Sequence, residues 1–204
     1  MLLAAGLAFA IPVQAKPVQI VGFGDSLMAG YGLGPGEGFT DQLQEALRAK
    51  GHDAVVANAG VSGDTTSGGL ARLDWSVPDE TDLVILELGA NDMLRGVDPS
   101  IVEENLDEMI VRLKARGIKV LLAGMVAAPN LGPAYGKAFG ALYPRLAQKH
   151  DVFFYPFFLD GVAGEMSLLH EDGMHPSADG VRIMVEKIMP VVEQALAVFS
   201  GSRP

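Results

Sequence analysis

Short apolar runs rich in β-branched residues alternate along this chain with longer amphipathic segments. The apolar runs lie at residues 18–23, 54–58, 83–88, 119–124 and 152–155. Several of them are apolar on both faces, as parallel strands are when helices cover both sides of a sheet. Five such alternations predict an α/β fold: a three-layer α/β/α sandwich around a five-stranded parallel sheet, with a flavodoxin-like strand order.

The segments between these runs carry helix start and stop signals. We expect Thr40 to cap a helix that ends at Gly51. Asp98, followed by a proline, is expected to begin another helix that ends at Gly117. A last helix is expected over residues 177–198. The 204 residues are 49% hydrophobic and show no linker or repeat, so residues 16–204 are predicted to form a single domain.

The first 15 residues form an apolar segment that ends in Val13-Gln14-Ala15. Such an ending is typical of a signal-peptidase site. The apolar part is shorter than the roughly 20 residues that a membrane-spanning helix needs, and no basic residue precedes it. We interpret residues 1–15 as a signal peptide and predict a periplasmic or secreted protein. The alternative is an N-terminal arm on a cytoplasmic protein.

Charge and cysteine content exclude several classes of function. The formal net charge of −10 argues against a nucleic-acid partner or an anionic membrane, both of which favour a basic face. The chain has no cysteine, so it has no thiol nucleophile, no disulfide and no cysteine-ligated zinc. We expect a small-molecule partner and no stable membrane insertion; the oligomeric state stays open.

Polar residues that follow a predicted strand are the best candidates for a site. In open parallel sheets, ligands bind beyond the carboxyl ends of the strands. The candidates at this edge are Ser26, Gly63 and Asn91 after the first three strands, and Asp172 and His175 beyond the fifth. His52 and His150 each precede a strand and therefore fall on the opposite edge.

A serine hydroxyl needs a base and a residue that orients the base before it becomes a good nucleophile. Asp172 and His175 are three residues apart on one short loop, so the carboxylate can hold one ring nitrogen while the other faces Ser26. His170 is the alternative base. The spacing from His170 to His175 is one residue too long for the zinc motif H-E-x-x-H. We therefore predict neither a metal nor any other cofactor.

Acyl transfer also requires hydrogen-bond donors for the oxyanion that forms. The backbone N–H of Ser26, the loop glycine Gly63 and the side-chain amide of Asn91 can supply them. Each residue taken alone has a simpler explanation as a turn, a loop or a helix cap. Their placement at one sheet edge favours the catalytic interpretation.

Four sequence blocks resemble those of the SGNH (GDSL) hydrolases, in the same order. They are GDSL at residues 24–27, SGDT with Gly63, GAND at residues 89–92 and DGMHP at residues 172–176. The likeness covers nearly the whole chain after residue 15 and is greatest to the bacterial arylesterase, thioesterase and lysophospholipase branch. It implies a serine nucleophile at Ser26, oxyanion donors at Ser26, Gly63 and Asn91, and a triad completed by Asp172 and His175. Asp25 is expected to brace the nucleophile turn.

This resemblance implies a serine ester hydrolase, with short or medium acyl or aryl esters as substrates and thioesters as side substrates. Thioesterase, lysophospholipase or acyltransferase activity is possible on the same site. Tyr135 and Phe139, four residues apart on an expected helix, are predicted to line an acyl or aryl slot. The alternative for Phe139 is that it belongs to the core face of that helix.

Two other functions stay open at this point. A carbohydrate deacetylase of the same family is one, although the apolar loop at residues 125–140 offers a sugar few polar partners. The other is a flavodoxin-like binding module that holds a phosphate or flavin on the first glycine-rich loop. No basic residue lies between Gly22 and Gly38, which argues against a phosphate site.

Overall fold

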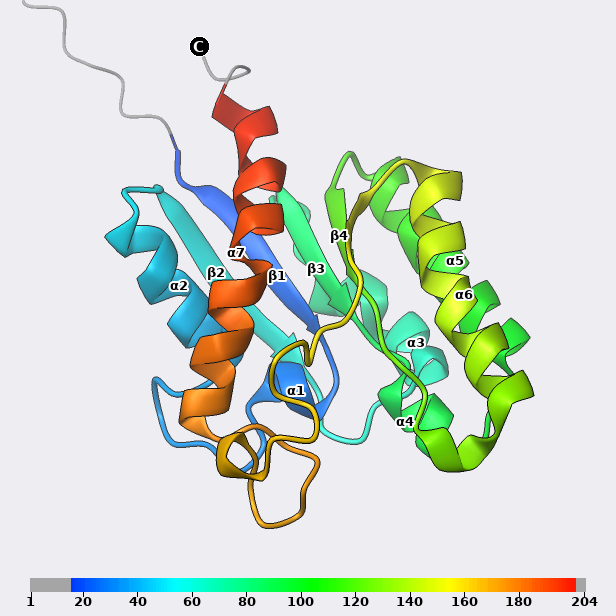
Figure 1. Cartoon of the computed structure of the whole chain (residues 1–204). Helices are drawn as coiled ribbons and strands as arrows, with labels where there is room; N and C mark the ends of the chain where they lie inside the picture. Colours follow the sequence, from blue (N-terminus) through cyan, green and yellow to red (C-terminus); the bar gives the residue numbers. More distant parts are fainter. Residues whose placement is uncertain (1–15, 201–204) are drawn as a thin grey trace, which may run out of the picture.

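The computed structural model describes residues 16–200 and is built on one parallel sheet (Figure 1). Its strands are β1 (Val18–Gly24), β2 (Ala54–Gly60), β3 (Leu83–Glu87), β4 (Lys119–Ala123) and β5 (Phe153–Tyr155). They lie in the order β2-β1-β3-β4-β5, with every neighbouring pair parallel. The predicted five-stranded flavodoxin-like sheet is confirmed. The expected signal peptide lies outside the described residues.

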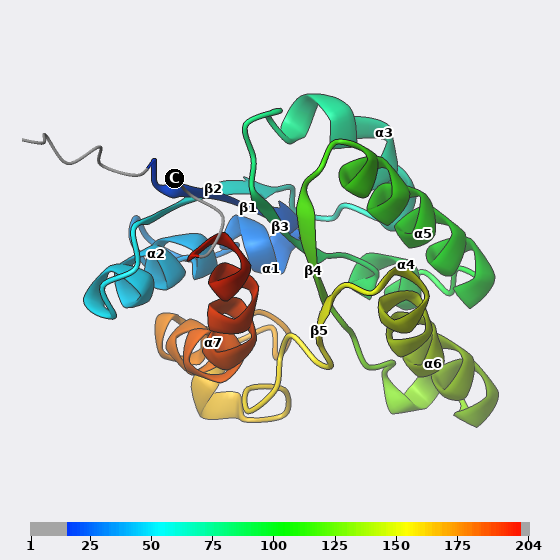
Figure 2. The ribbon, with the colours of Figure 1, turned by 90° about the horizontal axis from the view of Figure 1, so that it is seen from above.

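Helices cover both faces of the sheet. They are α1 (Ser26–Ala29), α2 (Phe39–Ala49), α3 (Thr66–Ser76), α4 (Ala90–Leu94), α5 (Pro99–Ala115), α6 (Pro133–His150) and α7 (Ala178–Ser200), with the short 3-10 helices η1 (Pro129–Leu131) and η2 (Met166–Leu168). Seen from above, α2 and α7 pack together on one side, and α3, α5 and α6 pack on the other (Figure 2). This is the predicted three-layer sandwich.

The helix boundaries follow local hydrogen bonds. As predicted, Asp98 caps α5, because its carboxylate accepts the N–H of Ser100 at 2.8 Å. The prediction that Thr40 caps the helix is wrong by two residues: the cap position is the extended Gly38, and α2 begins at Phe39. Thr40 lies inside the first turn, where its buried methyl group packs over Gly22 of β1.

The core lies between the sheet and its two helix layers. All five residues of β3 are fully buried, whereas the edge strand β2 has several exposed residues. A central strand has helices on both faces and no contact with water, which explains why the first four residues of β3, 83–86, are all apolar. Within residues 16–200, no helix is both long enough and apolar enough to cross a membrane.

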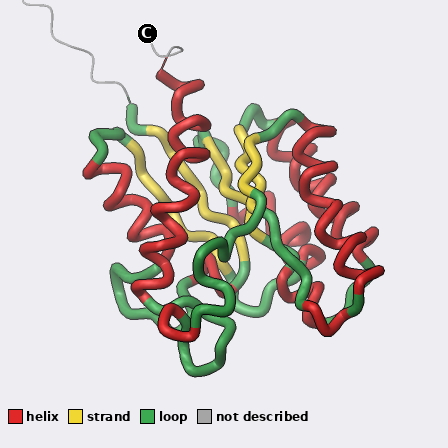
Figure 3. Tube along the Cα trace, viewed as in Figure 1, coloured by secondary structure: helices red, strands yellow, loops and turns green. Residues whose placement is uncertain are grey.

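The loops that follow the strands gather at one end of the sheet, shown in green at the lower side of Figure 3. They include the turn after β1, the loop between β2 and α3, and the long segment between β5 and α7. Because all strands are parallel, residues far apart in sequence meet at this carboxyl edge. This arrangement positions the site.

Candidate active site

Ser26 is the first residue of α1, directly after the turn that leaves β1. Asp25 caps this short helix, and its Oδ1 accepts the N–H of Leu27 at 3.0 Å. The cap fixes the backbone on both sides of the serine. Gly24 precedes it because a side chain there would collide with the carboxylate and backbone of Glu87 on β3.

The Ser26 hydroxyl contacts a histidine that comes from the other end of the chain. Its Oγ lies 2.8 Å from Nε2 of His175, and Nδ1 of that ring lies 2.6 Å from Oδ2 of Asp172. The other Asp172 oxygen accepts the backbone N–H groups of His175 at 3.0 Å and Met174 at 2.9 Å. These N–H groups, with the imidazole, hold the pKa of Asp172 well below its ordinary value, so the carboxylate is ionised.

The sequence did not predict that an aromatic ring lies over the histidine. The ring of Tyr31, on the loop after α1, lies 4.5 Å from the His175 ring, measured between centroids, at an angle of 40°. Tyr31 is 55% exposed and lines the same cavity as Ser26. The two rings are therefore in contact, tilted relative to each other. No local pattern distinguishes this tyrosine from an ordinary loop residue.

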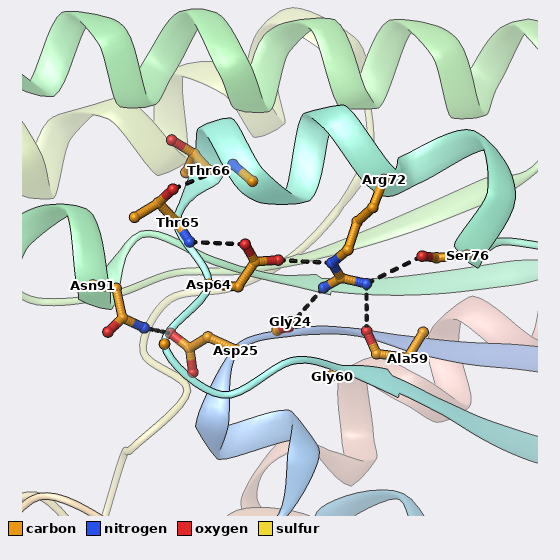
Figure 4. A network of polar contacts seen from close by, with 12 residues as sticks. Gly24, Asp25, Ala59, Gly60, Asp64, Thr65, Thr66, Arg72, Ser76 and Asn91 are labelled. Atoms are coloured by element: carbon orange, nitrogen blue, oxygen red, sulfur yellow. Dashed lines mark hydrogen bonds and ion pairs between the residues drawn. The ribbon is translucent and has the colours of Figure 1, made fainter.

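Gly63 and Asn91 lie at the same cavity as Ser26. Gly63 has φ of 81°, a left-handed conformation that favours glycine. The side-chain amide of Asn91 donates one hydrogen to Oδ2 of Asp25 at 3.1 Å (Figure 4). An asparagine amide carries two N–H groups, so the second stays free for a bound group. The structure thus brings together the residues predicted for the catalytic and oxyanion roles.

The cavity beside Ser26 has a volume of about 390 Å³. Its apolar wall consists of Leu27, Tyr31, Ala90, Met93, Leu94, Ala128, Leu159, Ala163, Leu169 and Met174. These residues come from loops and short helices around the carboxyl edge. A site with this lining accommodates an apolar group and carries its polar chemistry at one end.

Tyr135 and Phe139 do not line this cavity, which corrects the prediction that they form the substrate slot. Phe139 is fully buried and packs edge-on against Tyr143, at 5.6 Å between ring centroids. The hydroxyl of Tyr135 donates to the carbonyl of Val97 at 2.8 Å. The reason is the packing of α6 on the α5 side of the sheet, which turns this aromatic stripe into the core, as the alternative reading of Phe139 anticipated.

The other histidines do not contact Ser26. His52 pairs with Glu193 at 3.2 Å and His150 with Asp107 at 2.6 Å. The backbone N–H of His170 donates to the carbonyl of His175 at 2.8 Å, so His170 belongs to the loop that presents the base.

A buried carboxyl pair lies beneath the serine. The N–H of Asp25 donates to Oε2 of Glu87 at 3.2 Å, and both side chains are buried. Burial raises the pKa of Asp25 to about 6, against the lowering effect of its hydrogen bonds from Leu27 and Asn91. Burial, and next the charge of Asp25, raise the pKa of Glu87 well above its ordinary value. Glu87 was missed by the sequence analysis, although an acid at the end of an apolar strand is a usable signal.

Among residues 16–200, no three His, Cys, Asp or Glu side chains are grouped so that they could hold a metal ion. A hydroxyl, an imidazole and an ionised carboxylate in sequence form the arrangement that activates serine nucleophiles. The α/β sandwich and the site together define a serine hydrolase.

The chain belongs to the GDSL-like lipase/acylhydrolase family, whose model matches residues 23–183. It is 38% identical to esterase TesA of Pseudomonas aeruginosa over 198 residues, 96% of this chain and 98% of that protein. It is 40% identical to an arylesterase of Vibrio mimicus over 167 residues, 81% of this chain and 83% of the relative.

The solved structures give the same assignment. The SGNH-hydrolase family esterase AlinE4 superposes with a TM-score of 0.75 at 45% identity, covering 90% of this chain and 98% of that one. The predicted SGNH resemblance and fold are confirmed. The protein is a serine esterase that acts on carboxylic ester bonds of small-molecule substrates.

Proposed function

We propose that Ser26 is the nucleophile, His175 the general base and Asp172 the residue that orients the base. Oγ of Ser26 attacks the ester carbonyl carbon while Nε2 of His175 takes its proton. The same imidazole then protonates the leaving alkoxide, and the alcohol departs from an acyl-enzyme. Water, deprotonated by His175, attacks the acyl carbon and releases the acid and free Ser26. The observation that carries this proposal is the unbroken set of contacts at 2.8 and 2.6 Å.

The contact between His175 and Asp172 supports these roles because it selects one tautomer of the imidazole. An ionised Asp172 can only accept hydrogen bonds, so the ring nitrogen that faces it, Nδ1, carries the hydrogen. In the neutral imidazole, Nε2 is then the nitrogen with the lone pair, and it faces the Ser26 hydroxyl at 2.8 Å, as a base requires. The carboxylate also stabilises the imidazolium that forms after proton transfer.

We propose that the oxyanion is bound by the backbone N–H groups of Ser26 and Gly63 and by the free N–H of Asn91. All three residues line the cavity next to the serine hydroxyl. Asp25 supports them from below, because it caps α1 through Leu27 and holds the Asn91 amide in place. Donors fixed before the reaction need no reorganisation when charge develops, and this is their catalytic value.

The apolar cavity favours short and medium acyl or aryl esters over a carbohydrate substrate. Its wall offers carbon atoms where sugar hydroxyls need polar partners. Each methylene that an acyl chain buries adds up to about 0.8 kcal/mol until the cavity is full. We therefore expect kcat/KM to rise over the first few carbons and then to fall.

We also propose that residues 1–15 are removed as a signal peptide and that the esterase acts in the periplasm or outside the cell. The apolar run and its small-residue ending at Ala15 support this. N-terminal sequencing of the protein from periplasm and medium tests the proposal, with Lys16 as the expected first residue. An intact N-terminus on active protein in the cytoplasm would contradict it.

A panel of p-nitrophenyl esters of rising chain length, with an acyl-CoA, a lysophospholipid and an acetylated sugar beside it, tests the proposed substrate class. We expect acetate and butyrate esters to be hydrolysed best, and Ser26→Ala to abolish turnover of every active substrate. Highest activity on the acetylated sugar would favour the deacetylase instead. A steady rise in kcat/KM to palmitoyl esters would contradict an acyl site that is limited to this cavity.

A further inference from the structure

A buried cation that takes no part in the proton transfers lies next to the proposed oxyanion donors. Arg72, on α3, is only 7% exposed, and its guanidinium lies 4.0 Å above the ring of Phe23. It donates to the carbonyl of Gly24 at 2.9 Å, to the carbonyl of Ala59 at 2.8 Å and to Oδ2 of Asp64 at 2.7 Å (Figure 4). One side chain therefore joins the end of β1 to the end of β2 and to the loop that follows β2.

The three groups that accept from Arg72 lie close in sequence to two of the proposed oxyanion donors, Ser26 and Gly63. Gly24 ends β1, two residues before Ser26. Asp64 directly follows Gly63, and Ala59 lies at the end of β2 where this loop begins. The N–H groups of Ser26 and Gly63 thus belong to the two chain segments that Arg72 holds at a fixed separation.

A second set of hydrogen bonds connects this loop to the third donor. The N–H and hydroxyl of Thr66, at the start of α3, donate to the two carboxylate oxygens of Asp92 at 2.8 and 2.7 Å. Asp92 is the neighbour of Asn91, whose amide donates to Asp25. Hydrogen bonds therefore link the three segments that carry the proposed donors, and the Arg72–Asp64 ion pair belongs to this network.

We propose that Arg72, held by Asp64, is a positioning residue that sets the separation of the Ser26 and Gly63 N–H groups in the oxyanion hole. The inference rests on the proposed function of those groups. A guanidinium is planar and has five donors in a fixed fork, so it bridges three acceptors in fixed geometry. A lysine keeps the charge beside Asp64 but cannot bridge the two carbonyls in the same way.

Arg72→Lys is the variant that tests this role. The two strand ends lose their common donor, so the two N–H groups no longer converge as well on the oxyanion. We expect kcat per active site to fall ~10–100-fold, which is at most the effect of removing one oxyanion donor. KM should stay within about twofold of the wild-type value. Affinity for a trifluoromethyl ketone, which forms a tetrahedral oxyanion on the serine, should fall by a similar factor, whereas affinity for the alcohol product, which places no oxyanion there, should not change.

Arg116→Lys is a matched control. Arg116 also donates to a backbone carbonyl, that of Val77 at 2.6 Å, and to an aspartate, Asp79, at 2.9 Å. It contacts the far end of α3, where Val77 ends the helix, and lines no part of the cavity. We expect it to keep wild-type kcat even where the two variants lose comparable thermal stability.

Asp64→Asn gives an independent test at the other side of the ion pair. It keeps the shape of the side chain and weakens the hold on Arg72, so kcat should fall in the same direction. If the pair acts as one unit, the double variant loses no more activity than the more damaged single variant. Multiplying losses would show that the two residues act separately and would overturn the proposed pairing.

The measurement is hydrolysis of p-nitrophenyl butyrate, with competent sites counted by a fluorophosphonate titrant. Unchanged kcat per titrated site in Arg72→Lys, with only a lower melting temperature, would overturn the inference and leave Arg72 a purely structural residue. So would a raised KM with kcat intact. In either case the wild-type protein still hydrolyses esters and is still labelled on Ser26. If the wild type itself neither hydrolyses esters nor reacts with the titrant, the proposed function has failed instead.

Discussion

Replacing Asn91 with alanine removes a side chain that serves two neighbours at once. In the proposed mechanism one N–H of its amide stabilises the oxyanion, while the other donates to Oδ2 of Asp25 at 3.1 Å. The loss of one oxyanion donor costs about 2.7–4 kcal/mol of transition-state stabilisation, or ~10²–10³-fold in kcat. The oxyanion bond forms mainly in the transition state, so KM should stay within about twofold of the wild-type value.

The same variant should lose stability in a pH-dependent way. Burial raises the pKa of Asp25 to about 6, and the Asn91 hydrogen bond is one of the contacts that lower it. Without that bond the pKa rises further, so the folded protein holds the Asp25 proton to a higher pH than the unfolded chain. The free energy of unfolding falls with rising pH wherever the folded state binds more protons than the unfolded chain. In the variant this fall continues to a higher pH than in the wild type. We expect a deficit of about 1–3 kcal/mol at pH 8 that shrinks toward pH 5.

Steady-state hydrolysis of p-nitrophenyl butyrate and urea unfolding at pH 5 and pH 8 together check this prediction. The reasoning on the oxyanion would be refuted if KM rose while kcat was preserved, since Asn91 would then bind the ground state. A stability deficit equal at both pH values would refute the link to Asp25 ionisation.

Three further outcomes follow from the described contacts. Asp172→Asn should lower kcat by ~10⁴-fold without unfolding the protein, because the amide favours the wrong imidazole tautomer. His170→Ala should lower kcat far less. Equal losses of kcat in the two variants would mean that the base is misassigned. In the wild type, the raised pKa of Glu87 makes its ionisation in the folded state costly, so the free energy of unfolding falls as the pH rises above the ordinary carboxyl range. Glu87→Gln should make this fall smaller. A slope unchanged from wild type in urea unfolding between pH 5 and 8 would rule this out. Leu94→Trp should fill the cavity wall and move the chain-length optimum to shorter esters, and an ester profile identical to wild type would place Leu94 outside the acyl site.

The sheet edge that carries the proposed site could be predicted from the sequence, because the alternation of strands and helices determines where the strands end. Once the apolar runs were recognised as parallel strands, Ser26 and His175 had to fall on the same end of the sheet, although they are 149 residues apart. The spacing from Asp172 to His175 then indicated a local pair, and the structure brings these two side chains within 2.6 Å. Chain topology thus carried most of this information.

The lining of the cavity could not be predicted in the same way. Tyr135 and Phe139 have helical spacing, but spacing alone does not tell whether an aromatic stripe faces a substrate or the core. The actual wall includes Leu94 and Met174, which lie on a short helix and a loop and follow no periodic pattern. Side chains at such positions are placed by tertiary contacts that the sequence does not reveal.

Arg72 shows a different limit of sequence analysis. It lies on α3, a helix with little amphipathic pattern, so the sequence alone predicts that a basic residue there is exposed. Only the folded structure shows that its guanidinium is enclosed between two strand ends and a loop. The buried position is possible because the carbonyls of Gly24 and Ala59 and the carboxylate of Asp64 satisfy its donors.

Peptide mass spectrometry of the protein after reaction with a fluorophosphonate tests the central claim most directly. We expect one adduct per chain, on Ser26, together with complete loss of ester hydrolysis. His175→Ala should slow the labelling strongly, and Ser26→Ala should prevent it. An adduct on another residue, or full hydrolytic activity in protein that is labelled or lacks Ser26, would contradict the proposed mechanism.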